Sequence, residues 1–156
     1  MNTSFFNPIF IAAKLNPISA LAVNLVAKNL LGGLIPPDCL EPIEEYHATL
    51  LYEKKGTSIE IPYSEPLYTC DVMKARGVGI NFSYMGKGII AMVMSSPYLR
   101  AVNKVLYAKS LSRSQFSSYV PHITVAKNVE HIPKLPTMIK VPVYFDYLYS
   151  APLKGD

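Results

Sequence analysis

Two short apolar segments of this 156-residue chain each carry one histidine and one threonine, two positions apart. The segments span residues 46–51 and 120–125, and their aliphatic and β-branched side chains predict a strand in each case. Side chains two positions apart point to the same face of a strand, so each histidine should stand beside a threonine. The four residues are His47 and Thr49 in the first segment, and His122 and Thr124 in the second.

The sequence around these segments predicts a helix before each of them. Asn16-Pro17 and Ser96-Pro97 each combine an N-cap residue with a proline suited to the first helical position. The predicted helices span residues 17–31 and 97–111. The predicted strands span residues 8–15, 46–52, 67–82, 89–94, 120–125 and 141–149. A glycine turn within residues 84–88 connects the third and fourth of these strands as a hairpin.

Two features of this pattern lead to specific expectations. The apolar residues of the first helix, which include Ile18, Leu21 and Leu25, are expected to pack in the core. Residues 53–66 contain Gly56 and several polar residues and are expected to form a long loop. Loops of this length in compact domains often carry function, so whether this one closes over a site stays open.

The length and composition predict a single domain over residues 1–156. Half of the residues are apolar, which is enough to bury a core in a chain of this size. Each half contains a helix followed by a His-x-Thr strand, which indicates a degenerate duplication. We therefore predict a pseudo-symmetric α+β fold that brings the two marked strands together around one cleft.

Two histidines and two threonines that face one another can cleave a phosphodiester without a metal. Imidazole titrates near pH ~6.5, so at neutral pH one ring can act as a base while the other acts as an acid. Threonine hydroxyls beside them can donate hydrogen bonds to the phosphate oxygens, on which charge builds in the transition state. The sequence alone does not assign which histidine is the base.

Other types of site fit the sequence less well. No third ligand with metal-site spacing accompanies His47 and His122, and no GxSxG nucleophile motif or phosphate-binding glycine loop is present. A single His-x-Thr would more simply be an ordinary strand segment, but two in equivalent places favour a shared function. His131 lies in a proline-containing connection without a matching threonine and is expected to have no catalytic role.

Charge and hydropathy place limits on the partners. The net charge of +4 is mild and the lysines are scattered, so a small anionic ligand fits at least as well as long nucleic acid. The apolar stretch 9–34 is interrupted by lysine and asparagine, and predicts neither a signal peptide nor a membrane span. We expect a soluble, cytoplasmic protein without a membrane partner, and the sequence does not give the oligomeric state.

The segments His-Ala-Thr-Leu at residues 47–50 and His-Ile-Thr-Val at residues 122–125 resemble the two motifs of the two-histidine (2H) phosphoesterase superfamily. Pro121 before the second histidine and the Ser-Pro that opens the second predicted helix are also similar to that superfamily. The small size, the setting of the first motif and the ending Ala151-Pro152-Leu153 resemble those of the phage anti-CBASS phosphodiesterases.

This resemblance implies a bilobal fold, with two antiparallel sheets around a central cleft and helices outside, and an active site without metal or other cofactor. It implies His47 and His122 as the acid and base, and Thr49 and Thr124 as the phosphate-holding groups. The implied substrates are cyclic di- and trinucleotide signals with 3′–5′ linkages, cleaved in the cytoplasm of an infected bacterium to evade CBASS immunity.

Two aromatic residues are candidates for holding the bases of such a substrate. Phe10 in the first predicted strand and Tyr149 in the last could stack on a base, although Phe10 fits a core position equally well. The alternatives that stay open are a 2H enzyme acting on 2′,3′-cyclic phosphate ends or 2′–5′ linkages of RNA, and a non-catalytic sponge that binds cyclic nucleotides.

Overall fold

The structure, a computed structural model, describes residues 9–53, 65–66, 75–108 and 119–152. Its strands are β1 (Ile9–Leu15), β2 (His47–Glu53), β3 (Glu65–Pro66), β4 (Arg76–Gly86), β5 (Ile89–Ser95), β6 (His122–Ala126) and β7 (Val141–Pro152). Its helices are α1 (Pro17–Leu31) and α2 (Pro97–Ala108), and two short 3₁₀ turns are η2 (Pro37–Cys39) and η3 (Ile43–Glu45).

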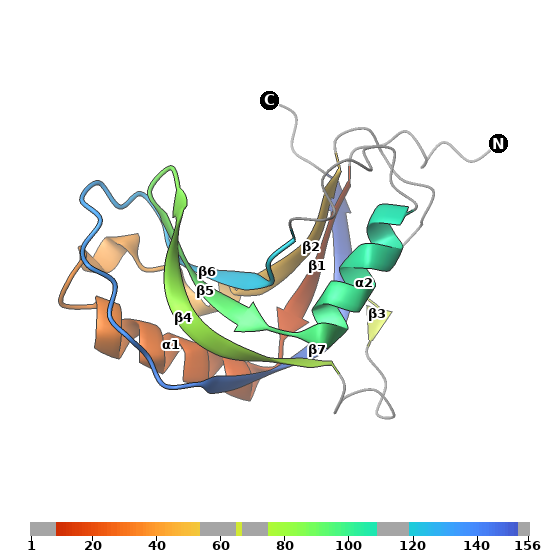
Figure 1. Ribbon diagram of the computed structural model, residues 1–156, viewed down its shortest axis with the longest axis horizontal. Helices are drawn as coiled ribbons and strands as arrows, with labels where there is room; N and C mark the ends of the chain where they lie inside the picture. The colour runs from red at the N-terminus through yellow and green to blue at the C-terminus, as the bar shows by residue number, and fades with distance from the viewer. Residues whose placement is uncertain (1–8, 54–64, 67–74, 109–118, 153–156) are drawn as a thin grey trace.

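The strands form one antiparallel sheet in the order β1-β2-β6-β5-β4-β7-β3, with a further pairing between β1 and β7. The long strand β7 pairs with β4 through Val141 to Tyr144 and with β1 from Phe145 onward. It thereby connects the two halves of the sheet. Figure 1 shows the result as a U-shaped sheet, with β4 and β5 in one arm and β1 and β2 in the other.

The predicted α+β fold is confirmed, and the structure refines how its strands connect. The two sheets that the family resemblance implied are joined into one bent sheet, because β7 is long enough to pair with both arms. Strand β4 continues to Gly86, and Gly86 and Gly88 close the β4–β5 hairpin at φ values of 92° and 77°, which favour glycine. The predicted strand residues 67–74, helix residues 109–111 and loop residues 54–64 lie outside the described residues.

Helix α1 has the predicted bounds, but the face that it buries differs from the prediction. Asn16 caps the helix through its side-chain oxygen, which accepts hydrogen bonds from two backbone amides of the first turn. The backbone amide of Tyr144 donates to Ser19 Oγ at 2.9 Å, and this bond fixes which side of α1 faces β7. The buried residues are Ser19, Val23, Ala27 and Leu31.

The expectation that Ile18, Leu21 and Leu25 pack in the core is therefore wrong. These side chains are 76%, 56% and 59% exposed. Apolar residues occur all around α1, so the sequence pattern does not single out one face. The small residues Ser19 and Ala27 line the side that approaches the sheet, where larger side chains would keep the helix farther away.

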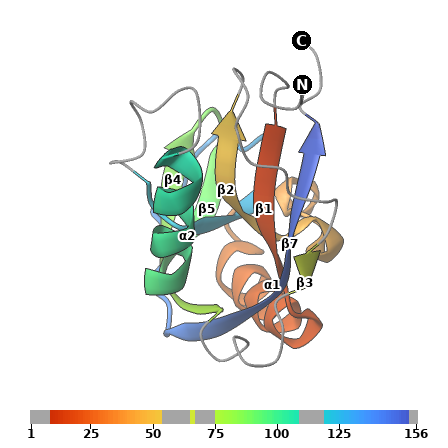
Figure 2. The same cartoon turned by 90° about the vertical axis from the view of Figure 1, so that its right-hand side faces the viewer.

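The core lies between the sheet and the two helices, which pack on its outer side, α1 against β7 and α2 against β2 (Figure 2). Helix α2 buries Leu99 and Leu106. It also buries Asn103, whose amide donates to the backbone carbonyl of Leu50 at 2.7 Å. This bond satisfies two buried polar groups and holds α2 against the strand that carries the first His-x-Thr pair. Among the described residues, no helix is both long enough and apolar enough to cross a membrane.

Candidate active site

The two His-x-Thr segments lie on neighbouring antiparallel strands. Ala48 of β2 pairs with Ile123 of β6, so the antiparallel register puts His47 opposite Thr124 and Thr49 opposite His122. The two histidines then occupy diagonal positions, for which the separation is about 7–8 Å. Two histidine side chains on one face at this backbone separation can both reach a single phosphate group. The sequence-based expectation that the two pairs share one place in the fold agrees with this register.

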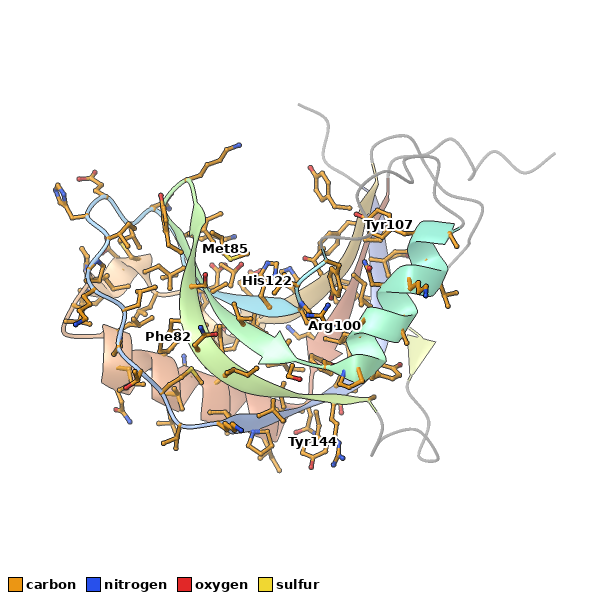
Figure 3. The ribbon with its side chains drawn as sticks, in the orientation of Figure 1. Phe82, Met85, Arg100, Tyr107, His122 and Tyr144 are labelled. Atoms are coloured by element: carbon orange, nitrogen blue, oxygen red, sulfur yellow. The ribbon has the colours of Figure 1, made fainter. Side chains whose placement is uncertain are left out.

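All four side chains point away from the core. Ala48 and Ile123, which alternate with them along the strands, are fully buried on the opposite face. His47, Thr49, His122 and Thr124 are each of intermediate exposure. Figure 3 shows His122 on the floor of the concave face of the U-shaped sheet, between Met85 of β4 and the residues Arg100 and Tyr107 of α2.

Both histidine rings are held in the same way by the main chain. Nδ1 of His47 lies 2.8 Å from the carbonyl oxygen of Glu45, and Nδ1 of His122 lies 2.8 Å from that of Val120. A carbonyl oxygen can only accept, so each Nδ1 carries a proton and donates it. The nitrogen that gains or loses a proton is therefore Nε2 in both rings. Each ring can act as a base when neutral and as an acid when protonated.

The surroundings of His47 disfavour its charged form. Burial of the ring lowers the pKa of His47 below its ordinary value, although the bond to the Glu45 carbonyl opposes this shift. The ammonium groups of Lys14 and Lys127 lower the pKa further. Lys14 pairs with His47 across the β1–β2 ladder and donates a hydrogen bond to the carbonyl of Glu44. His47 is therefore mostly neutral near pH 7.

The aromatic candidates Phe10 and Tyr149 lie beside the first histidine. The Phe10 ring meets His47 edge-on, with centroids 5.4 Å apart, and meets Tyr149 at 6.1 Å. A register shift between Lys14 and Leu15 puts Phe145 in the core and turns Tyr147 and Tyr149 to the face that carries the histidines. Burial raises the pKa of Tyr149 to about 12, so its hydroxyl remains protonated at neutral pH.

Three residues near the site were not predicted from the sequence. Lys14 lies beside His47, whereas Tyr119 and Arg100 lie at the other end, where the Tyr119 hydroxyl donates to the carbonyl of Thr49 at 3.0 Å. The one lysine in an otherwise apolar first strand was a usable signal for Lys14. Tyr119 and Arg100 carry no comparable pattern, because their place depends on how α2 packs against β2.

Among the described residues, no group of three or more His, Cys, Asp or Glu side chains could hold a metal ion. Cys39 is a free thiol, and its sulfur lies 3.5 Å from the carbonyl oxygen of Asn128. The remaining histidine, His131, is exposed in the connection before β7.

The chain is similar to two curated phage proteins. It is 26% identical over 153 residues to the anti-CBASS protein Acb1 of Enterobacteria phage T4, covering 97% of this chain and 92% of that protein. It is 25% identical over 149 residues to Acb1 of Yersinia phage phiR1-RT, covering 95% of this chain and 90% of that protein. No protein-family model matches the chain.

Solved structures share its fold at low sequence identity. A crystal structure of a phosphoesterase superposes with a TM-score of 0.57 at 12% identity, covering 96% of this chain and 90% of that one. LigT of E. coli complexed with ATP gives 0.57 at 14% identity and covers 96% of both chains. LigT complexed with 3′-AMP gives 0.56 at 14% identity, again over 96% of both chains. The chain is therefore similar in sequence to the phage anti-CBASS protein Acb1 over nearly its whole length, and it shares its fold with LigT and a phosphoesterase.

Proposed function

We propose that this chain hydrolyses 3′–5′ phosphodiester bonds in cyclic di- and trinucleotides, with His47 and His122 as the acid and base. The observation that carries this proposal is the diagonal placement of the two rings on β2 and β6, each with Nδ1 bonded to a carbonyl. The similarity to proteins named for anti-CBASS activity supports a cyclic nucleotide as the substrate. LigT, which shares the fold, was solved with the nucleotides ATP and 3′-AMP.

The lowered pKa of His47 favours this ring as the base of the first step, because a base must be unprotonated when the step begins. Its Nε2 takes the proton of the ribose 2′-hydroxyl, and the 2′-oxygen attacks the neighbouring phosphorus. The bond from phosphorus to the 5′-oxygen breaks, and Nε2 of protonated His122 gives its proton to that oxygen. The products of this step are a 2′,3′-cyclic phosphate and a free 5′-hydroxyl.

The second step reverses the two roles. His122, now neutral, takes a proton from water, and His47, now protonated, gives its proton to the departing ribose oxygen. Each proton transfer of this kind is typically worth about 10²- to 10⁴-fold in rate. Thr49 and Thr124 donate hydrogen bonds to the non-bridging oxygens in both steps. These four groups supply the required chemistry, so we propose a reaction that is independent of metal.

The aromatic side chains beside His47 provide a surface for the base next to the scissile phosphate. Phe10 and Tyr149 lie on the same face as the histidine and contact each other. Stacking on an aromatic ring tolerates any base and is worth about 1–3 kcal/mol. We propose that these two residues contribute to affinity more than to the choice among bases, and that the enzyme acts in the cytoplasm of an infected bacterium.

The test is incubation of the protein in EDTA with a panel of cyclic di- and trinucleotides, including cGAMP, followed by chromatography of the products. We expect cleavage by the wild type and by His131→Ala, and its loss in His47→Ala and His122→Ala. Tight binding of intact ligand without cleavage would instead indicate a sponge. Cleavage confined to RNA ends with 2′,3′-cyclic phosphate, or to 2′–5′ linkages, would indicate a 2H RNA phosphodiesterase.

A further inference from the structure

The two halves of the site lie on strands that share little backbone hydrogen bonding. Within the described residues, β2 and β6 are paired through Ala48 and Ile123 alone. By contrast, β1 pairs with β2 and β5 pairs with β6 over most of their lengths. The relative position of the two His-x-Thr pairs therefore depends on additional contacts across this junction.

One end of β6 is fixed by backbone bonds to the segment that precedes β2. The amide of Glu41 donates to the carbonyl of Val125, and the amide of Lys127 donates to that of Cys39, both at 2.8 Å. These bonds lie beyond Thr124, next to the His47 end of the site. The other end of β6 begins at His122, opposite Thr49, and lies beyond the one pairing of β6 with β2 that the described residues show.

We propose that Tyr119 is the residue that holds this other end, and thereby positions His122 relative to Thr49. The Tyr119 hydroxyl donates to the backbone carbonyl of Thr49 at 3.0 Å. Its own carbonyl accepts from Nη1 of Arg100 at 3.2 Å, which fixes the Tyr119 backbone to α2. The adjacent residue is Val120, whose carbonyl holds the ring of His122.

This series of contacts joins the two half-sites through one side-chain oxygen. A displacement of the Tyr119 backbone would carry the Val120 carbonyl with it and change the direction of the His122 ring. The amide of Met94 donates to the carbonyl of Pro121 at 2.9 Å, which ties the segment to β5 but not to β2. Burial raises the pKa of Tyr119 far above its ordinary value, so the hydroxyl remains a donor throughout the working range of a histidine pair.

The role of Tyr119 rests on the proposed function, since positioning matters only if His122 transfers a proton. The variant Tyr119→Phe removes a single oxygen atom. The matched control is Tyr84→Phe, because the Tyr84 hydroxyl makes a similar bond of 3.1 Å, accepting from the amide of Gly88 in the β4–β5 hairpin. Both changes cost one hydrogen bond to the backbone, but only the first spans the two half-sites.

We expect Tyr119→Phe to lower kcat on the order of tenfold with KM within about twofold, because misplacement of an acid or base acts on the chemical step. Tyr84→Phe should leave both constants unchanged and lower the melting temperature less, because Tyr84 is 45% exposed and water can replace its bond. Arg100→Met, which releases the Tyr119 backbone from α2, should also lower kcat. A kcat within twofold of wild type in Tyr119→Phe would overturn the proposal.

A measurement without substrate separates this inference from the proposed function. His122 and Thr49 are opposite each other, so the ring protons of His122 and the methyl group of Thr49 should show a nuclear Overhauser effect. We expect its intensity to fall in Tyr119→Phe and to persist in Tyr84→Phe, even if the protein cleaves none of the nucleotides. An unchanged intensity in folded Tyr119→Phe would refute the positioning role and leave the catalytic proposal standing.

Discussion

Replacing Thr49 or Thr124 by valine isolates the contribution of the hydroxyl groups to the proposed reaction. Valine keeps the branched shape and the strand preference of threonine but removes the one polar group. Both positions lie on the concave face at intermediate exposure, beside the buried residues Ala48 and Ile123. The change therefore leaves the core untouched and should alter the free energy of unfolding by about 0.5 kcal/mol or less.

The expected loss of activity follows from the role of the hydroxyl in the transition state. Removal of one preorganised donor to a developing oxyanion costs about 10²- to 10³-fold in kcat, or about 2.7–4 kcal/mol. The antiparallel register places Thr49 opposite His122 and Thr124 opposite His47. Because the two threonines are equivalent in this register, their losses should agree within about tenfold. The double variant should lose less than the product of the two, since the groups act on one phosphate.

The assay is steady-state cleavage of a cyclic dinucleotide in EDTA, with thermal unfolding of every variant measured in parallel. Thr137→Val is the matched control, because Thr137 is exposed in the connection before β7. The variants Thr49→Ser and Thr124→Ser keep the hydroxyl and should recover most of the activity. If the valine variants retain kcat within threefold of wild type, the threonines do not hold the phosphate in the transition state.

Three further variants test the environment of the site and the fold. Lys14→Met removes a positive charge that lowers the pKa of His47, so the pKa of His47 should rise. The acidic limb of the pH profile of kcat/KM should then move to higher pH. An acidic limb that stays in place or moves to lower pH would contradict this expectation. Leu31→Ala, at a fully buried position of α1, should lower the free energy of unfolding in urea by about 2–5 kcal/mol. Leu25→Ala, at a position of the same helix that is 59% exposed, should lower it by about 0.5 kcal/mol or less. Similar losses for the two variants would show that both faces of the helix are buried. Asn16→Ala removes the N-cap of α1 and should lower the free energy of unfolding in urea by about 1 kcal/mol. An unchanged free energy of unfolding would mean that water replaces the cap.

Much of the fold could be predicted because local rules determine it. The cap and proline at Asn16-Pro17 and Ser96-Pro97 mark the first residues of α1 and α2, and the glycines around residue 87 mark the hairpin. These signals act within a few residues, where backbone sterics and capping bonds decide the conformation. The burial of α1 was predicted wrongly, because a helix that is apolar all around leaves its orientation to a contact with β7.

The pair of His-x-Thr segments was the part of the site that the sequence determined by itself. Strand periodicity puts each histidine and threonine on one face, and this rule needs no knowledge of the partner strand. The tertiary structure decided that the two strands are neighbours, that Ala48 pairs with Ile123, and that the two rings are therefore diagonal. It also brought Lys14, Tyr119 and Arg100 to the site. Register and helix packing are set by burial summed over residues far apart in the chain, so no local pattern specifies them.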